Sequence, residues 1–426
     1  MLTDELIALD HLRWLIESGR ELLTAMGPPV SRQPRLPSEL LGKLEPWQHS
    51  LLQQQNELRW RSRSRFPRPE LWIWTERSLA QASDYWSAHY KARLFPKNER
   101  VIDACCGAGA DLVALAERGE VLGVDGQPGL SQLAHDNARA HGYQVPVATE
   151  MLTSAWQAAA DWLSIDPDRR PAGRRTNDAD EFSPSLADVL ILASRVRGAV
   201  VKLAPSTRIQ VELCEHIDEC AQRMWLGNQG ECRQQLLLMG ELKREQARTA
   251  VLCEPLATQG QHHVVSHVTP VYGETALSEF SGRSERPTRV VDVPLRYVLD
   301  LHNVLHAAEL QATWANQQRV YALGDAHGYY TADDLPGSAW AQAFEVLDVL
   351  PWDDRQLRKW LRKHRAGTVE VKSRALGVQA INIDANVSQR RYSAAEGEPV
   401  TLLVTRLGDR IRGIAARRIA CDGDRM

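Results

Sequence analysis

A glycine-rich turn between Asp103 and Asp111 carries the strongest chemical signal in the sequence. The apolar run 101–106 predicts a buried strand, and Gly107 and Gly109 let the chain turn tightly and approach a ligand closely. A helix is predicted next, so its free N–H groups face the same ligand. Asp125 ends the following predicted strand, where a carboxylate can accept hydrogen bonds from both hydroxyls of an adenosine ribose. The pattern predicts a site for a nucleotide-like cofactor.

Two kinds of cofactor compete for this turn. A dinucleotide site needs the pattern G-x-G-x-x-G, and Leu112 stands where the third glycine would be. S-adenosylmethionine (SAM) needs an acid in the strand and a short glycine turn, because a carboxylate such as Asp103 pairs with the ammonium of a methionine moiety. We therefore favour SAM; the alternative is a strand, turn and helix that bind no ligand.

A second group of polar residues follows the fourth predicted strand, 162–166. The sequence there is Asp166-Pro-Asp-Arg-Arg170, and Asp166 is a candidate to orient or deprotonate a nucleophile. The candidate substrate-binding residues beside it are Arg169, Arg170, Arg174 and Arg175, because guanidinium groups suit phosphate. The alternative is that Asp166 caps a turn and the arginines pair with nearby aspartates.

The elements that must position these residues alternate between strand and helix from Arg100 to about residue 203. Such alternation predicts an α/β fold with a doubly wound, mostly parallel sheet. Four parts are expected: a helical N-terminal extension (1–97), the α/β domain (98–255), a linker or connecting region (256–340) and a small α+β domain (341–426).

Composition excludes several classes of protein. The 426 residues carry a formal net charge of -3, so the chain is not basic throughout. Seven cysteines without a C-x-x-C pair predict neither a disulfide framework nor a zinc site, and no metal is expected elsewhere. No apolar run approaches the ~18 residues of a membrane span. The first residues, acidic and amphipathic, do not resemble a signal peptide, so we expect no membrane association and a cytoplasmic protein.

The predicted C-terminal domain is more basic than the whole chain. Residues 341–419 contain 15 Lys or Arg and 9 Asp or Glu. Arg358 and Arg362 lie on the face of a predicted helix away from Leu357 and Leu361, a pattern typical of nucleic-acid binding. The alternative interpretation is a solvated helix face.

The chain resembles the class I SAM-dependent methyltransferases. Residues 101–142 are most similar to the trimethylguanosine-synthase-related branch, and the larger similarity is to a bacterial family with a C-terminal THUMP-like domain. That similarity includes residues 65–95, 166–175, 200–205 and 357–375, and covers roughly 60–255 and 341–420.

The resemblance assigns roles to individual residues. Asp103, Gly107 and Gly109 would hold the methionine end of SAM, and Asp125 the ribose. The remaining cofactor candidates are Gly126 and Gln127 beside the adenine, Glu150 and Met151 at its edge, and Thr75 and Gln81 as a cover. For Thr75 and Gln81, a helix cap and a surface residue are equally good interpretations.

THUMP domains bind RNA, so the resemblance implies that the substrate is a structured RNA, either tRNA or rRNA. The methyl group would be transferred to an acceptor held near Asp166. Many amine methyltransferases read Asp/Asn-Pro-Pro-aromatic at this turn; the second proline and the aromatic are missing here, which weakens the case for an amine acceptor. Two alternatives remain: a non-catalytic module that binds SAM or RNA, and a small-molecule methyltransferase. The methylated atom and the oligomeric state do not follow from the sequence.

Overall fold

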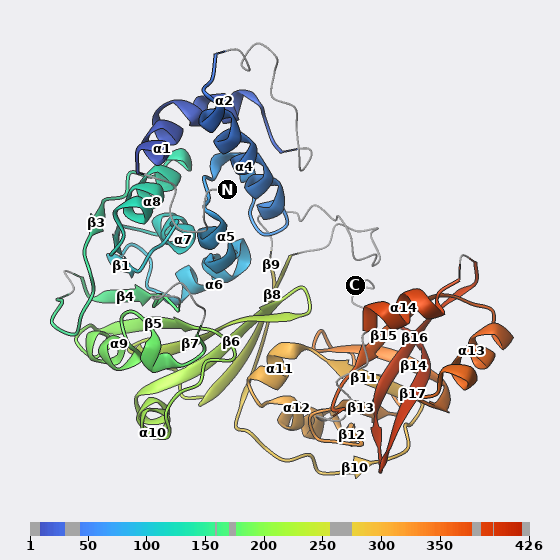
Figure 1. Ribbon diagram of the computed structural model, residues 1–426. Coiled ribbons are helices and arrows are strands. Elements are labelled where there is room, and N and C mark those ends of the chain that lie inside the picture. Colours follow the sequence, from blue (N-terminus) through green and yellow to red (C-terminus); the bar gives the residue numbers. More distant parts are fainter. Residues whose placement is uncertain are drawn as a thin grey trace. The chain divides into compact units, whose positions relative to one another are not determined.

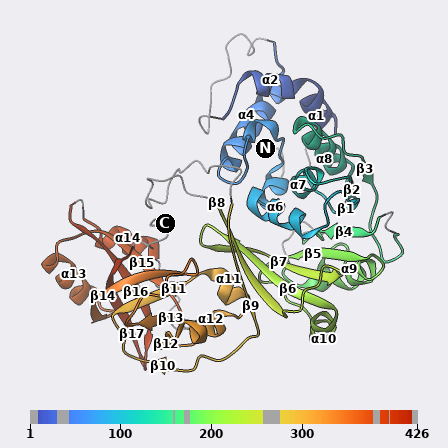
Figure 2. The same cartoon turned by 180° about the vertical axis from the view of Figure 1, so that it is seen from behind.

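The computed structural model describes residues 9–29, 43–157, 160–169, 176–255, 275–376, 385–394 and 396–419. The chain forms two compact units (Figures 1 and 2). The first contains residues 1–229, 233–247 and 252–277, and the second contains 230–232, 248–251 and 278–426. No helix among the described residues is long and apolar enough to span a membrane.

The N-terminal part of the first unit is helical. Its elements are α1 (Leu9–Trp14), the π-turn η1 (Leu15–Gly19), α2 (Arg20–Ala25), α4 (Pro46–Ser62), the 3-10 turn η2 (Pro69–Leu71), α5 (Glu76–Gln81) and α6 (Tyr85–Leu94). Thr75 and Asp84 start α5 and α6, because their side chains accept hydrogen bonds from Ser78 N and Ser87 N.

A parallel sheet follows, in the order β3-β2-β1-β4-β5. Its strands are β1 (Val101–Ala104), β2 (Val121–Asp125), β3 (Val147–Thr149), β4 (Trp162–Ile165) and β5 (Gly198–Leu203). The intervening helical elements are α7 (Ala110–Ala116), α8 (Pro128–Ala140), η3 (Ala179–Glu181) and α9 (Leu186–Ala193). The strand order reverses between β1 and β4, which is where open α/β sheets bind their ligands. The predicted α/β fold class is confirmed.

Antiparallel strands extend this sheet. After α10 (Val211–Cys220) come β6 (Ala221–Asn228) and β7 (Glu231–Gly240), and β7 pairs with β5. The strand order ends with β8 (Arg248–Pro255) and β9 (Thr275–Gly282), whose residues are divided between the two units.

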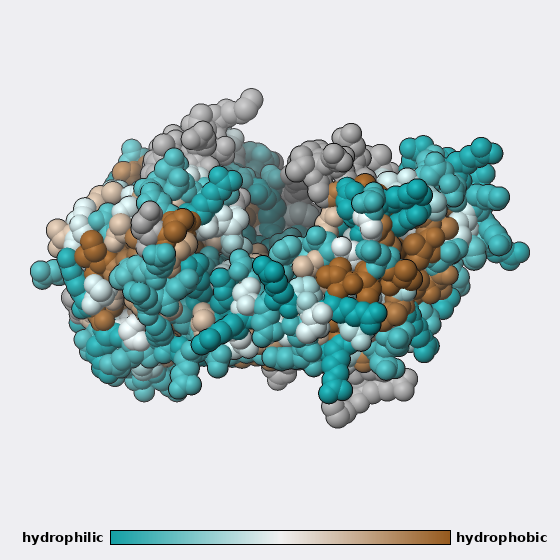
Figure 3. Space-filling model, turned by 90° about the horizontal axis from the view of Figure 1, so that it is seen from below, coloured by the Kyte–Doolittle hydropathy of each residue, from teal (hydrophilic) through white to brown (hydrophobic). Residues whose placement is uncertain are grey.

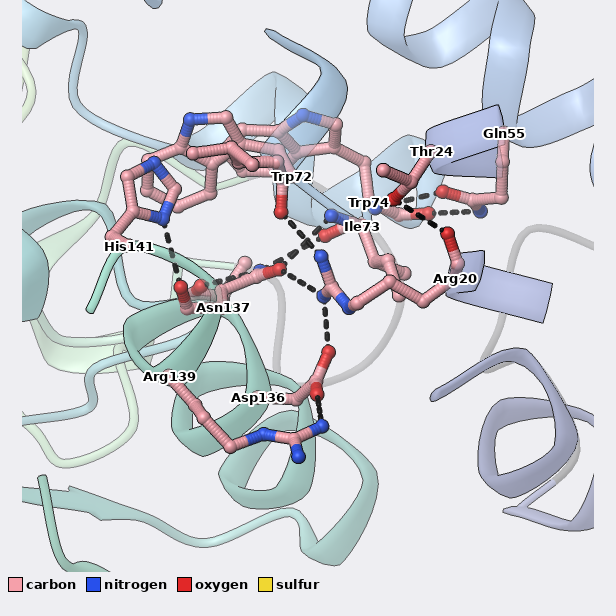
Figure 4. A network of polar contacts seen from close by, with 12 residues as sticks. Arg20, Thr24, Gln55, Trp72, Ile73, Trp74, Asp136, Asn137, Arg139 and His141 are labelled. Carbon is pink, nitrogen blue, oxygen red and sulfur yellow. Dashed lines mark hydrogen bonds and ion pairs between the residues drawn. The ribbon is translucent and has the colours of Figure 1, made fainter. Parts of the chain in front are cut away.

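Asn137 of α8 ties the N-terminal helices to the sheet domain (Figure 4). Its buried amide accepts a hydrogen bond from Ile73 N and donates to the carbonyl oxygens of Ile73 and Ala108. Arg20 of α2 also donates to Asn137 and pairs with Asp136. The segment before α5 is therefore fixed to the turn that follows β1.

Trp72 and Trp74 belong to the same interface. Both are buried, and their rings stack with centroids 4.8 Å apart. Burial of this kind assigns these two side chains to packing within the protein.

The second unit is built on an eight-stranded sheet in the order β10-β12-β13-β11-β14-β17-β16-β15. Its first half contains β10 (Val290–Val291), β11 (Tyr297–Leu301), α11 (Asn303–Ala307), α12 (Gln311–Gln318), β12 (Tyr321–Leu323) and β13 (Tyr329–Ala332). Its second half contains β14 (Ala341–Pro351), α13 (Asp354–Lys363), β15 (Ala366–Ser373), α14 (Ala385–Tyr392), β16 (Glu398–Leu407) and β17 (Arg410–Arg418).

The expected linker at 256–340 differs from the structure over residues 278–340. This stretch supplies four strands of the sheet, and β11 pairs directly with β14. Asp300 of β11 is buried and forms ion pairs with Lys372 and Arg374, which belong to the predicted C-terminal domain. The boundary at 341 therefore falls inside one folded unit. Residues 256–274 lie outside the described part of the chain.

Hydrophilic residues cover most of the face drawn in Figure 3, and hydrophobic residues gather on parts of it. The exposed apolar side chains of the second unit include Leu347 and Val349 of β14. Single exposed apolar residues of this kind are ordinary on a protein surface.

Candidate cofactor site

A cavity of about 400 Å³ opens at the carboxyl ends of β1, β2 and β4. It brings together ten of the residues predicted from the sequence: Thr75, Gln81, Asp103, Gly107, Asp125, Gly126, Gln127, Met151, Asp166 and Arg169. They come from α5, three strands and the loops that follow these strands. The volume is in the range of small-molecule sites.

Two carboxylates, those of the buried Asp103 and the largely buried Asp111, line this cavity. Asp103 Oδ1 accepts a hydrogen bond from Ser164 at 3.0 Å, and Asp111 Oδ2 accepts from Lys91 Nζ at 2.5 Å and Ser83 Oγ at 2.9 Å. The second oxygen of each carboxylate is buried without a hydrogen-bond partner among the described residues. Unpaired buried oxygens are costly, so the site is suited to a cationic ligand.

The two carboxylates differ in protonation. Burial, reinforced by the negative charge of Asp111, raises the pKa of Asp103 to about 8. Burial opposes the ionisation of Asp111 as well, but the ammonium groups of Lys91 and Lys202 lower the pKa of Asp111 below its usual value. Asp111 is therefore the member of the pair that is ionised near neutral pH.

Asp125 is held rigidly at the end of β2. Its Oδ2 accepts a hydrogen bond from Gly107 N and its Oδ1 from Gln127 N, both at 2.9 Å. Burial raises the pKa of Asp125, and these two backbone hydrogen bonds oppose that rise. Each oxygen retains a further lone pair, as the hydroxyls of a ribose require.

The glycines have separate roles. Gly107 has φ +58°, and a Cβ there would meet open space, so its backbone shape rather than crowding favours glycine. Gly109 does not line the cavity; a Cβ on it would approach the Ala134 backbone to 3.2 Å, so it permits α8 to pack closely. At Gly126 a Cβ would overlap the sulfur of Met151, so the absence of a side chain there allows Met151 to line the cavity beside it.

Glu150 is not among the lining residues. It is exposed, and its Oε2 accepts a hydrogen bond from Trp156 Nε1 at 2.8 Å. Thr75 caps α5, as one interpretation of the sequence predicted, and it also lines the cavity.

The aspartates in the turn after β4 form ion pairs with lysine and arginine side chains from other elements. Lys202 of β5 donates to Asp166 Oδ2 at 2.5 Å and to the Gln81 carbonyl oxygen at 3.2 Å. Arg77 of α5 donates to Asp168 Oδ2 at 2.5 Å, and Gln81 Nε2 donates to Asp168 Oδ1 at 3.0 Å. These bonds fasten α5 over the turn. Gln81 therefore contributes by binding Asp168 and Lys202.

The predicted arginines fall into two places. Arg169 lines the cavity, whereas Arg170, Arg174 and Arg175 lie outside the described residues. Arg358 and Arg362 line a separate hollow within the second unit.

Comparison with known proteins identifies the fold and one of the domains. A family model described as THUMP domain-like matches residues 341–418. An uncharacterized SAM-dependent methyltransferase of Mycobacterium tuberculosis is 26% identical over 341 residues, covering 79% of this chain and 85% of that protein. A crystal structure from Porphyromonas gingivalis W83, described as a methyltransferase, superposes with a TM-score of 0.66 at 18% identity and covers 98% of this chain and all of the other.

The chain has the fold of a SAM-dependent methyltransferase, and its residues 341–418 match a THUMP-like domain. The resemblance inferred from the sequence is thus confirmed. A shorter match is to a 23S rRNA (uracil(1939)-C(5))-methyltransferase of Shewanella denitrificans, 35% identical over 86 residues, which covers 17% of this chain and 18% of that enzyme.

Proposed function

We propose that this class I methyltransferase transfers the methyl group of SAM to structured RNA, tRNA or rRNA. The observation that supports the cofactor is a pair of buried carboxylate oxygens, Asp103 Oδ2 and Asp111 Oδ1, in a cavity at the strand reversal; neither has a hydrogen-bond partner in the described part of the chain. The M. tuberculosis relative that matches over most of the chain is a SAM-dependent methyltransferase, which supports the same enzyme class and cofactor.

The lining residues fit the parts of SAM. Asp103 and Asp111 would take the α-ammonium, because a charged hydrogen bond satisfies both buried oxygens. Asp125, fixed by Gly107 N and Gln127 N, would accept hydrogen bonds from the ribose hydroxyls. Gly126 and Met151 would form the wall beside the adenine.

Catalysis by this chain is mainly a matter of positioning. Bound SAM would supply an electrophilic methyl group on a positively charged sulfur. Asp166 would orient the acceptor atom or receive its proton. Lys202 would hold the carboxylate in place through its hydrogen bond to Asp166 Oδ2. The hydrogen bonds from Arg77 and Gln81 to Asp168 keep α5 over the site. In this position α5 would exclude water and help to align the acceptor atom with the methyl group.

Three features favour RNA as the acceptor. The second unit carries a THUMP-like domain, and THUMP domains bind RNA. The segment shared with the S. denitrificans rRNA methyltransferase is short, but it adds an RNA-modifying enzyme to the relatives. Arg169, which lines the cavity, adds a guanidinium suited to phosphate.

The test is methyl transfer from labelled SAM into RNA taken from a strain that lacks the gene, with the modified nucleoside mapped by mass spectrometry. The Asp166→Asn variant should bind S-adenosylhomocysteine (SAH) normally yet transfer at least about 10²-fold more slowly, the usual contribution of a positioned acid or base. Asp178→Asn is the matched control, since Asp178 is an exposed cap of η3. Absence of label from all RNA, with label in a small molecule, would refute the RNA substrate.

A further inference from the structure

A second hollow lies within the second unit, beside α13 and α14. Its volume is about 610 Å³, in the range of ligand sites. Four arginines line it: Arg358, Arg362, Arg365 and Arg391. Glu396 is the acidic residue among the described residues that line it. The hollow therefore concentrates positive charge from two helices and the turn after α13.

This charge is only partly neutralised. Asp354 serves two of the arginines, with Arg391 Nη2 at 2.7 Å and Arg358 Nε at 3.3 Å. The guanidinium groups of Arg362 and Arg365 form no ion pair with any residue in the described ranges. Two arginines share one carboxylate, and two more have no ion pair in the described ranges. The hollow therefore has positive charge that a bound anion could neutralise.

The backbone around the hollow is tightly constrained. A Cβ on Gly367 would lie 2.5 Å from the Gly397 carbonyl oxygen, and one on Gly397 would lie 2.1 Å from that of Arg365. Only glycine permits this crossing of chain segments. Arg365 itself has φ +50° at the end of α13, a conformation that non-glycine residues adopt at a cost. The crossing therefore fixes the backbone of Arg365, which lines the hollow.

We propose that this arginine pocket (Arg358, Arg362, Arg365 and Arg391) binds a phosphate group of the RNA backbone. The proposal rests on RNA being the substrate, and it identifies a site on the second unit that contacts this RNA. Guanidinium forks match phosphate oxygens in two-point contacts. Exposed Lys363 and Arg390 extend the positive surface past the pocket, which suits a continuous polyanion better than a single small anion.

The experiment measures binding of the full chain to a fluorescein-labelled single-stranded RNA oligonucleotide by anisotropy. The variant Arg362→Gln/Arg365→Gln should bind at least about tenfold more weakly, and its slope of log affinity against log salt should fall by about 0.7 for each phosphate that the variant no longer neutralises. The matched control is Arg355→Gln/Lys359→Gln, which removes two charges from the same helix at positions that do not line the pocket. The control should bind less than about threefold more weakly than the wild type.

Each outcome decides the question. Equal weakening in the two double variants would show a diffuse field and overturn the pocket, as would unchanged binding in Arg362→Gln/Arg365→Gln. Competition by adenosine monophosphate stronger than by inorganic phosphate would support a nucleotide phosphate; the reverse order would indicate a free-anion site and overturn the proposal. Binding of a poly-glutamate peptide that depends on the pocket, with RNA binding unaffected, would assign it to an acidic protein partner instead.

Failure of this proposal is distinguishable from failure of the proposed function. Transfer of labelled methyl into RNA by the wild-type protein reads the function directly. Transfer that persists while the pocket variants bind RNA normally would leave the function standing and remove only the pocket. Circular dichroism and thermal unfolding of each double variant show that both are folded, which is expected because all four substituted side chains are at the surface.

Discussion

Replacement of Asp111 by asparagine should weaken binding of SAH selectively through its ammonium group. Asp111→Asn preserves the size of the side chain but removes the charge that faces the cavity beside Asp103. Lys91 stays hydrogen-bonded, because Ser83 Oγ lies 2.9 Å from its Nζ and an amide oxygen can still accept. The variant therefore changes the charge of the pocket with little change in its shape.

The size of the effect follows from the missing charged hydrogen bond. Such a bond contributes about 1.5–3 kcal/mol, and about 1.4 kcal/mol is a tenfold change in affinity. We expect SAH to bind Asp111→Asn about 10- to 100-fold more weakly. The compound 5′-methylthioadenosine has the adenosine and the sulfur but no ammonium, so its affinity should change less than about threefold.

Isothermal titration calorimetry with both ligands measures the difference. Asp168→Asn is the control, because Asp168 lines the same cavity but is bound by Arg77 and Gln81. That variant should not distinguish SAH from 5′-methylthioadenosine. Equal weakening of both ligands in Asp111→Asn would indicate a collapsed pocket, and unchanged SAH affinity would show that Asp111 does not face the ammonium; either result refutes the reasoning.

Three further predictions follow from the site and its supports. Asp125→Ala should weaken SAH and 5′-methylthioadenosine alike, by about 1–3 kcal/mol in calorimetry, because both contain the ribose; an effect confined to SAH would contradict the ribose role. Since the pKa of Asp103 is raised to about 8, binding of SAH should release a proton below that pH, and the affinity for SAH should increase from pH 6 to 8. Calorimetric titrations in buffers of different ionisation enthalpy would measure the released proton. Release of the same proton by Asp103→Asn would rule out Asp103 as its source. Asn137→Ala should lower the free energy of unfolding in urea by about 3 kcal/mol, because it leaves buried groups of Ile73 and Ala108 unpaired; Arg139→Ala, whose side chain is half exposed, should change it by less than about 1 kcal/mol.

The sequence was sufficient for the parts of the fold that local pattern determines. The apolar run 101–106, the glycines after it and Asp125 lie close in the chain, and their strand-turn-helix spacing has few structural solutions. The same holds for 341–418, where the apolar positions Leu357 and Leu361 lie on one face of α13 and the elements form the small α+β domain that was predicted.

Residues that meet across long stretches of chain could not be found this way. Lys91 and Asp111 are joined by the packing of α6 on α7, and Lys202 reaches Asp166 from the next strand of the sheet. A lysine within an amphipathic helix is ordinarily a surface residue, so nothing local marked Lys91 as buried. The position of Asp111 predicts the start of a helix and nothing more.

The stretch 278–340 was missed for a related reason. Its strands are short and contain polar residues such as Asp300 and Thr331, whose burial depends on Arg374 and on the Tyr297 carbonyl oxygen. The partners of Asp300 lie more than 70 residues away. Polar residues paired this distantly resemble a loop in the sequence.

A crystal structure of the protein with SAH tests the central claim most directly. The account predicts SAH in the cavity at the ends of β1, β2 and β4, with its ammonium nitrogen about 3 Å from Asp103 Oδ2 and Asp111 Oδ1 and its ribose hydroxyls on Asp125. SAH bound with its ammonium away from both carboxylates would contradict the assignment of the site, and failure of SAH to bind at all at millimolar concentration would contradict the proposed cofactor.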